Sequence, residues 1–161
     1  MSLINTNNCY RFFNMVTSIE NLENAQYEEE SQREKARWIE EKDKKGRTPL
    51  HIAAKYGNLI GLHYFLLLTN GNIDIRDNQF KHIIHYATES ENNEIVIYLL
   101  ENYYSKSINA QDHDGNTALH ISLRNRDYSL TKLLMAYKPD VHIINHLGKS
   151  PQQEAEDNRL L

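Results

Sequence analysis

The apolar residues of this chain gather in three short blocks that recur at a nearly constant distance. The blocks span residues 59–67, 95–100 and 130–134, and each is rich enough in leucine, isoleucine and valine to predict a helix with a buried face. Alternating segments at 73–75, 108–110 and 141–143 follow them and predict extended steps. No block can bury its apolar face alone, so the pattern predicts stacked units that share one core.

A histidine precedes each apolar block at equal spacing. His51, His85 and His120 are separated by 34 and 35 residues. The chain reads Thr-Pro-Leu-His-Ile-Ala-Ala from Thr48 and Thr-Ala-Leu-His-Ile-Ser from Thr117. Threonine favours a helix N-cap, and proline suits the first helical position, where no amide donor is needed. Each unit also opens with a residue that favours turns, namely Asp43, Asp77, Asp112 or Asn145.

The segment that begins at Thr48 matches the ankyrin signature Thr-Pro-Leu-His-x-Ala, and the period is close to that of an ankyrin repeat. The chain therefore resembles the ankyrin-repeat family. The resemblance implies an all-α solenoid of stacked helix-turn-helix units with β-hairpin fingers. We expect repeats near 43–76, 77–111 and 112–144, together a domain at 43–161 that ends in a partial, polar C-terminal cap at 145–161. Residues 1–42 lack a full signature and are expected to form degenerate N-terminal capping helices.

The second and third repeats depart from the signature. His82 and Ile83 stand where the first repeat has Thr-Pro, so we expect the helix cap of the second repeat to be lost. Phe80 replaces the glycine of the turn, and Glu91 and Arg126 replace the glycine that separates the two helices of the first repeat. A positive φ costs a non-glycine residue roughly 1 kcal/mol. Both repeats are therefore predicted to be weaker than an ideal one.

Composition narrows the possible functions. The net charge of −4 is too small to argue for direct nucleic-acid or membrane-surface binding, and no apolar run is long enough to span a bilayer. The single cysteine, Cys9, cannot close an intrachain disulfide, which favours a reducing intracellular compartment. We expect a protein of the host cytoplasm or nucleus that is monomeric when free.

The histidines do not predict a metal site. Stacked repeats would hold His51, His85 and His120 on the order of 10 Å apart, too far for one zinc ion with nitrogens at about 2.0 Å. His82 and His85 lie three residues apart, but no further cysteine or histidine has zinc spacing. The fingerprints of a P-loop, a Rossmann fold and a nucleophile elbow do not occur. The sequence therefore predicts neither an enzyme nor a bound cofactor or metal.

The expected binding surface follows from the register of the repeats. The family binds proteins on its concave face, where turn tips and the outward side of each first helix carry residues that the fold does not need. The stretch 42–47 is strongly basic, which suits a nuclear signal, a docking point for an acidic partner or simply a solvated finger. The expected contact residues are Lys44, Lys45, Arg47, Lys55, Tyr56, Asn78, Gln79, Phe80, Lys81, Glu89, Ser90, His113, Asp114, Asn116, Arg124 and Asn125.

A narrower resemblance concerns residues 108–121 and 140–153, which are similar to the later repeats of the NF-κB inhibitor proteins (IκB). The length and repeat number resemble those of the short viral IκB-like proteins of insect polydnaviruses, the vankyrins. This resemblance implies an inhibitor that holds a host Rel/NF-κB dimer and suppresses host immune signalling. Two alternatives stay open: a generic scaffold or bacterial effector that binds another host protein, and a regulatory array or enzyme fragment cut from a larger chain.

Overall fold

The structure is a computed structural model that describes residues 41–157. The predicted N-terminal capping helices, apart from residues 41 and 42, lie outside this range. The described residues form helices joined by turns. The helices are α3 (Pro49–Lys55), α4 (Leu59–Leu68), α5 (Ile83–Glu89), α6 (Asn93–Ser107), α7 (Ala118–Arg124), α8 (Tyr128–Ala136) and α9 (Pro151–Asp157).

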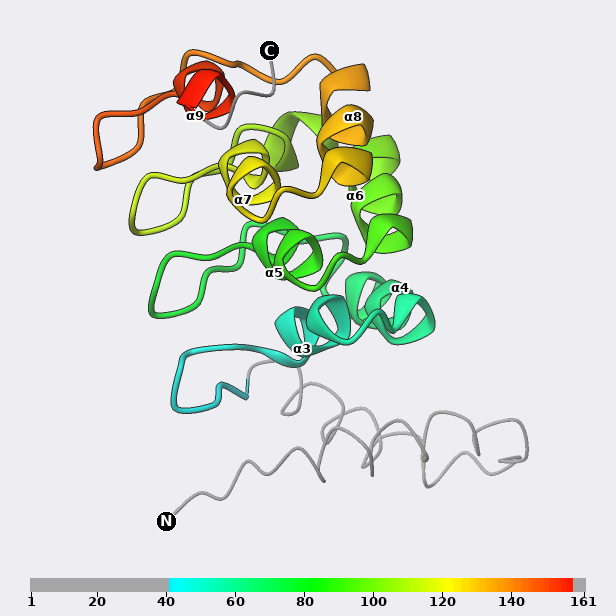
Figure 1. Ribbon diagram of the computed structural model, residues 1–161. Coiled ribbons are helices and arrows are strands. Elements are labelled where there is room, and N and C mark those ends of the chain that lie inside the picture. The colour runs from blue at the N-terminus through cyan, green and yellow to red at the C-terminus, as the bar shows by residue number, and fades with distance from the viewer. Residues whose placement is uncertain (1–40, 158–161) are drawn as a thin grey trace, which may run out of the picture.

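The helices stand in two columns (Figure 1). The inner column holds α3, α5, α7 and α9, and the outer column holds α4, α6 and α8. A long loop precedes each inner helix and projects away from the outer column. We call these loops fingers one to four, and their turns lie at residues 43–47, 77–81, 112–116 and 145–149. The predicted all-α stack of helix-turn-helix units is therefore confirmed for the described residues.

The apolar blocks fill the space between the columns, as their pattern predicts. On the outer helices, Leu62, Leu66 and Leu99 are buried, and on the inner helices Ile84 and Leu119 are buried. These side chains belong to one continuous cluster that runs from the first repeat to α9. Each unit is thus stabilised by burial against its neighbours, as expected for an array of repeats.

The fingers are not confirmed as β-hairpins, since no strand occurs between residues 41 and 157. In finger one the amide of Asp43 donates to the carbonyl of Arg47 at 3.0 Å, and fingers two to four repeat this bond. Each pair of neighbouring fingers shares a single backbone–backbone bond, such as that from the amide of Asn78 to the carbonyl of Lys45 at 2.9 Å. Contacts this sparse hold a stack of turns but do not make a ladder.

The recurring histidine closes the start of each inner helix and reaches the next repeat. In α3, Nδ1 of His51 accepts from the amide of Thr48 at 3.1 Å. The same ring bonds through Nε2 to the carbonyl of Lys81 in the second repeat, also at 3.1 Å. Since Nδ1 accepts, Nε2 carries the proton and donates. His120 makes the equivalent bonds to Thr117 and Lys149.

The predicted loss of the cap in repeat two is wrong. Nδ1 of His85 accepts from the amide of His82 at 2.9 Å, so the amide is satisfied without a threonine. Ile83, in the place of proline, is 1% exposed and belongs to the core. In the C-terminal cap, Oε1 of Gln153 accepts from the amide of Ser150 at 2.9 Å. The essential element is thus an acceptor three residues after the N-cap, which His or Gln supplies.

The predicted positive φ at the non-glycine turn positions is confirmed. Phe80 has a φ of 55°, where the corresponding glycine of finger one, Gly46, has 76°. Glu91 and Arg126 have φ of 55° and 57°, where the corresponding glycine of repeat one, Gly57, has 70°. These values lie in the left-handed region that disfavours side chains with a Cβ. The second repeat therefore holds backbone strain at both of these positions and the third repeat at one of them, whereas the first repeat has glycine at each.

We expect Glu91→Gly to stabilise the protein by about 0.5–1 kcal/mol, because strain relief exceeds the entropy that glycine gains in the unfolded chain. Urea unfolding at neutral pH measures the change. Glu94→Gly is the matched control, since Glu94 is equally exposed but lies in the first turn of α6. It should destabilise by about 1 kcal/mol, the usual cost of glycine within a helix. Equal destabilisation by both variants would contradict the strain argument.

Candidate protein-interaction surface

The predicted contact residues lie on the fingers and on or just after the inner helices. Most of them are exposed. Three are half-buried in α3 or the fingers, namely Arg47, Lys55 and Lys81, and Ser90 is half-buried just after α5. Phe80, at the tip of finger two, is 50% exposed, and Tyr56, just after α3, is 61% exposed.

A groove of about 190 Å³ opens between the second and third repeats. Its floor includes Ile121 of α7, and its walls come from fingers two and three and from the ends of α5 and α7. Eight of the expected contact residues line it. They are Gln79, Lys81, Glu89, His113, Asp114, Asn116, Arg124 and Asn125, and Asp112 completes the wall. The groove is strongly polar, which suits a hydrophilic peptide or loop rather than an apolar ligand.

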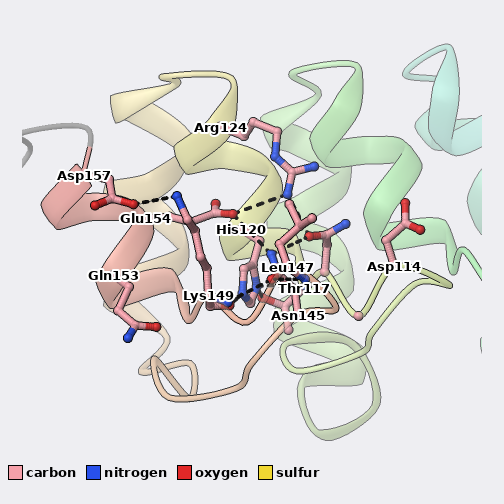
Figure 2. A network of polar contacts seen from close by, with 12 residues as sticks. Asp114, Thr117, His120, Arg124, Asn145, Leu147, Lys149, Gln153, Glu154 and Asp157 are labelled. Atoms are coloured by element: carbon pink, nitrogen blue, oxygen red, sulfur yellow. Dashed lines mark hydrogen bonds and ion pairs between the residues drawn. The ribbon is translucent and has the colours of Figure 1, made fainter.

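In every described unit except the first, side chains eight residues apart connect a finger to the end of the inner helix that follows it. In repeat two, Lys81 pairs with Glu89. In the C-terminal cap, Lys149 pairs with Asp157 at 2.6 Å, as Figure 2 shows. The charged groups of these four side chains are therefore partly engaged by contacts within the protein itself.

Repeat three makes the equivalent contact with an amide in place of one charge. Arg124 donates to Oδ1 of Asn116 at 2.8 Å. The finger-to-helix contact therefore recurs in repeats two and three and in the cap.

Repeat one is the exception among the described units. The same two positions hold Arg47 and Lys55, which are both cationic. Arg47 turns to the carboxylate of Asp43, with its Nε 2.6 Å from Oδ2. Lys55 has no ion pair among residues 41–157, and its ammonium lies 5.6 Å from the ring centre of Tyr56. The first repeat therefore presents charge that the later units neutralise.

Asn116 was expected at the contact surface, but it is only 3% exposed. Its Oδ1 accepts from Arg124 and from Nδ2 of Asn145, while Asn145 also donates to Glu154 at 3.2 Å. Glu154 is buried, and its carboxylate also forms an ion pair with Arg124 (Figure 2). Asn116 is therefore a structural residue that joins repeat three to the C-terminal cap.

The finger tips carry a row of rings. Phe80 stacks on His113 with ring centres 5.9 Å apart and planes 21° from parallel. His113 meets His146 of finger four edge-on at 6.4 Å. The contact residues expected from the sequence do not include His146 or its neighbour Leu147, which is 74% exposed. Extending the register of the finger tips by one more repeat would have found both.

Other kinds of site find little support in the described part of the chain. No group of three or more histidine, cysteine, aspartate or glutamate side chains is placed to hold a metal between residues 41 and 157. None of the helices described there is both long and apolar enough to cross a membrane.

Comparison with known proteins agrees with this architecture. A family model described as ankyrin repeats (three copies) matches residues 32–112 and 61–145. A putative ankyrin repeat protein, L371 of Acanthamoeba polyphaga mimivirus, is 34% identical over 64% of this chain. Mouse synphilin-1 is 26% identical over 73%, and human neurogenic locus notch homolog protein 1 is 29% identical over 67%.

The shared region is a small part of each relative. This chain spans 13% of the viral protein, 13% of synphilin-1 and 4% of the notch homolog. Nothing among these matches is specific to the vankyrins. The family match covers well over half of the sequence, and the chain belongs to the ankyrin-repeat family, whose repeats form a non-enzymatic scaffold for protein binding.

Proposed function

We propose that this protein binds a protein partner along the fingers and the inner helices, and that it acts by occupying the partner's surface. The observation that carries the proposal is the groove between repeats two and three, which is lined mainly by exposed or half-buried polar side chains. Phe80 is the aromatic anchor of this surface, because it is half-exposed at a finger tip although glycine would fit its backbone better. An interface of ordinary size, about 800 Å² per partner, would span about three repeats.

The more specific proposal is that the partner is a Rel-type transcription factor, which the protein inhibits by forming a stable complex with it in the host cytoplasm or nucleus. Its support is the similarity of residues 108–121 and 140–153 to the later repeats of the NF-κB inhibitor proteins. In the structure these residues build finger three, the start of α7, finger four and the start of α9. They therefore include one wall of the groove and two of the three finger-tip rings, His113 and His146.

The test is affinity capture of Rel proteins from insect cells, combined with a Rel-driven reporter. We expect the full-length protein to capture a Rel protein and to lower reporter output. Phe80→Gly should weaken capture by about tenfold, since loss of an aromatic anchor costs more than 1 kcal/mol. The same change relieves the positive φ, so the protein should remain folded.

Tyr128→Ala is the matched control. Tyr128 is 59% exposed but lies on outer helix α8, away from the fingers, so its loss should leave capture unchanged. Failure to capture any Rel protein, with an unchanged reporter, would rule out the Rel proposal. Equal capture of a partner by the wild type and by Phe80→Gly would instead contradict the finger surface as the binding site.

A further inference from the structure

The unbalanced charge of repeat one needs an explanation beyond the fold. The position of Lys55 is occupied by Glu89, Arg124 and Asp157 in the later units, and each of these contacts the finger of its own repeat. Lys55 does not, because Arg47 is cationic and is engaged by Asp43. The helix therefore tolerates several residue types here, and the architecture does not require lysine.

Two further cations lie at the tip of the same finger. Lys44 and Lys45 are exposed, and neither has an ion pair within residues 41–157. Their backbone carbonyls, in contrast, accept from Asn78 of finger two, which fixes the tip in place. Repeat one thus holds three ammonium groups, on an ordered part of the backbone, that no carboxylate among residues 41–157 compensates.

We propose that repeat one recognises a short acidic segment of the protein partner, with carboxylates that pair with Lys55 and with the finger-tip lysines Lys44 and Lys45. This inference rests on the proposed protein-binding function and adds the chemistry of the partner. The acidic segment supplies to Lys55 the counter-charge that Glu89 and Asp157 supply to Lys81 and Lys149 in the other units.

The surface beyond repeat one favours a peptide over a nucleic acid. Lys81 is already neutralised by Glu89, and Asp114 in finger three adds an exposed negative charge. A phosphate backbone that continued along the fingers would be repelled there, and the whole chain carries a net charge of −4. A peptide that is acidic only where it meets repeat one avoids this repulsion.

The decisive variant is Lys55→Glu. It places beside Arg47 the same kind of residue that pairs with Lys81 in repeat two, so the urea midpoint should not fall. The probe is a fluorescein-labelled oligoglutamate peptide, and its binding to the full chain is measured by anisotropy at low and high salt. We expect salt-sensitive binding by the wild type and about tenfold weaker binding by Lys55→Glu.

Lys132→Glu is the control, because Lys132 is an exposed lysine on outer helix α8 with no ion pair among the described residues, and its reversal changes the net charge equally. It should bind the peptide like the wild type. Equal losses in both variants, or no binding by the wild type at low salt, would overturn the proposal. Tighter binding of a DNA duplex at the same lysines would overturn it in favour of a nucleic acid.

The peptide assay needs no natural partner, so its outcome is independent of Rel capture. If the wild type and Lys55→Glu capture a host protein equally and neither binds the peptide, the acidic segment is ruled out and the protein-binding function stands. If the wild type binds the peptide but captures no host protein, recognition of an acidic segment stands and the proposed binding of a host protein is contradicted.

Discussion

Lowering the pH from 7 to 5 is expected to destabilise the protein by about 2 kcal/mol through His85 alone. Burial of its ring holds the pKa of His85 at about 4, below the ordinary value of 6.5. Burial also lowers the pKa of His51 and of His120, so both act in the same direction. In all three, a proton on Nδ1 would face the backbone amide that this nitrogen accepts in the folded state.

The sign of the effect follows from linkage. Because the folded state binds a proton on His85 more weakly than the unfolded state, the stabilisation is fully present above pH 6.5. It is lost progressively as the pH falls toward about 4, the window between the unfolded and folded pKa values. Urea unfolding followed by circular dichroism from pH 7.5 to pH 5 measures it, before most carboxylates titrate.

His85→Gln tests the assignment to this residue. Gln153 already makes the equivalent bond in the C-terminal cap, so glutamine can accept from the amide of His82 without titrating. The variant should lose stability at neutral pH but show a flatter pH dependence than the wild type. An unchanged pH dependence would show that His85 does not carry the effect.

Truncation of one core side chain in the second repeat should destabilise the protein as much as the change in pH does, or more. Ile84→Ala is expected to cost about 2–5 kcal/mol, the usual range for a fully buried isoleucine. Ile84 has no exposed surface and lies in α5, which packs against α3, α6 and α7. The substitution therefore weakens contacts with both neighbouring repeats. Chemical unfolding at neutral pH gives the value.

Ile60→Ala provides the matched comparison. It removes the same atoms from the outer helix α4, but Ile60 is 72% exposed. Its cost should stay within about 0.5 kcal/mol, as for most surface substitutions. Similar losses for both variants would mean that the interface between the repeats does not dominate stability.

Much of the fold could be predicted from the period of the chain. The recurrence of His51, His85 and His120 located the inner helices, and the apolar blocks located the outer ones, because a repeat array makes each local signal repeat. The cap of repeat two could not be predicted from the absence of threonine, since the acceptor is supplied by His85. The prediction that the fingers are β-hairpins was also not confirmed, because short turns joined by single backbone bonds satisfy their backbone groups without a strand ladder.

The candidate surface was less predictable than the fold. The register of the repeats places a residue on a face. Whether its side chain is free to contact another protein depends on side chains of the same chain that lie eight or about thirty residues away. Asn116 was expected to be free and is buried by contacts with Arg124 and Asn145. Arg47 is held by Asp43, while Lys55 has no such partner among residues 41–157. Such distinctions need the distances between side chains, which no pattern of residue types contains.

The histidine bonds have a consequence for cooperativity. Each of the three histidines makes a bond from Nε2 that crosses a junction, from His51 to Lys81, from His85 to Asn116, and from His120 to Lys149. Their free energy therefore belongs to the coupling between neighbours rather than to the intrinsic stability of one unit. Strained units joined by strong coupling unfold together instead of one at a time. The described array should consequently melt in a single step, and partly unfolded forms that expose the core should remain rare.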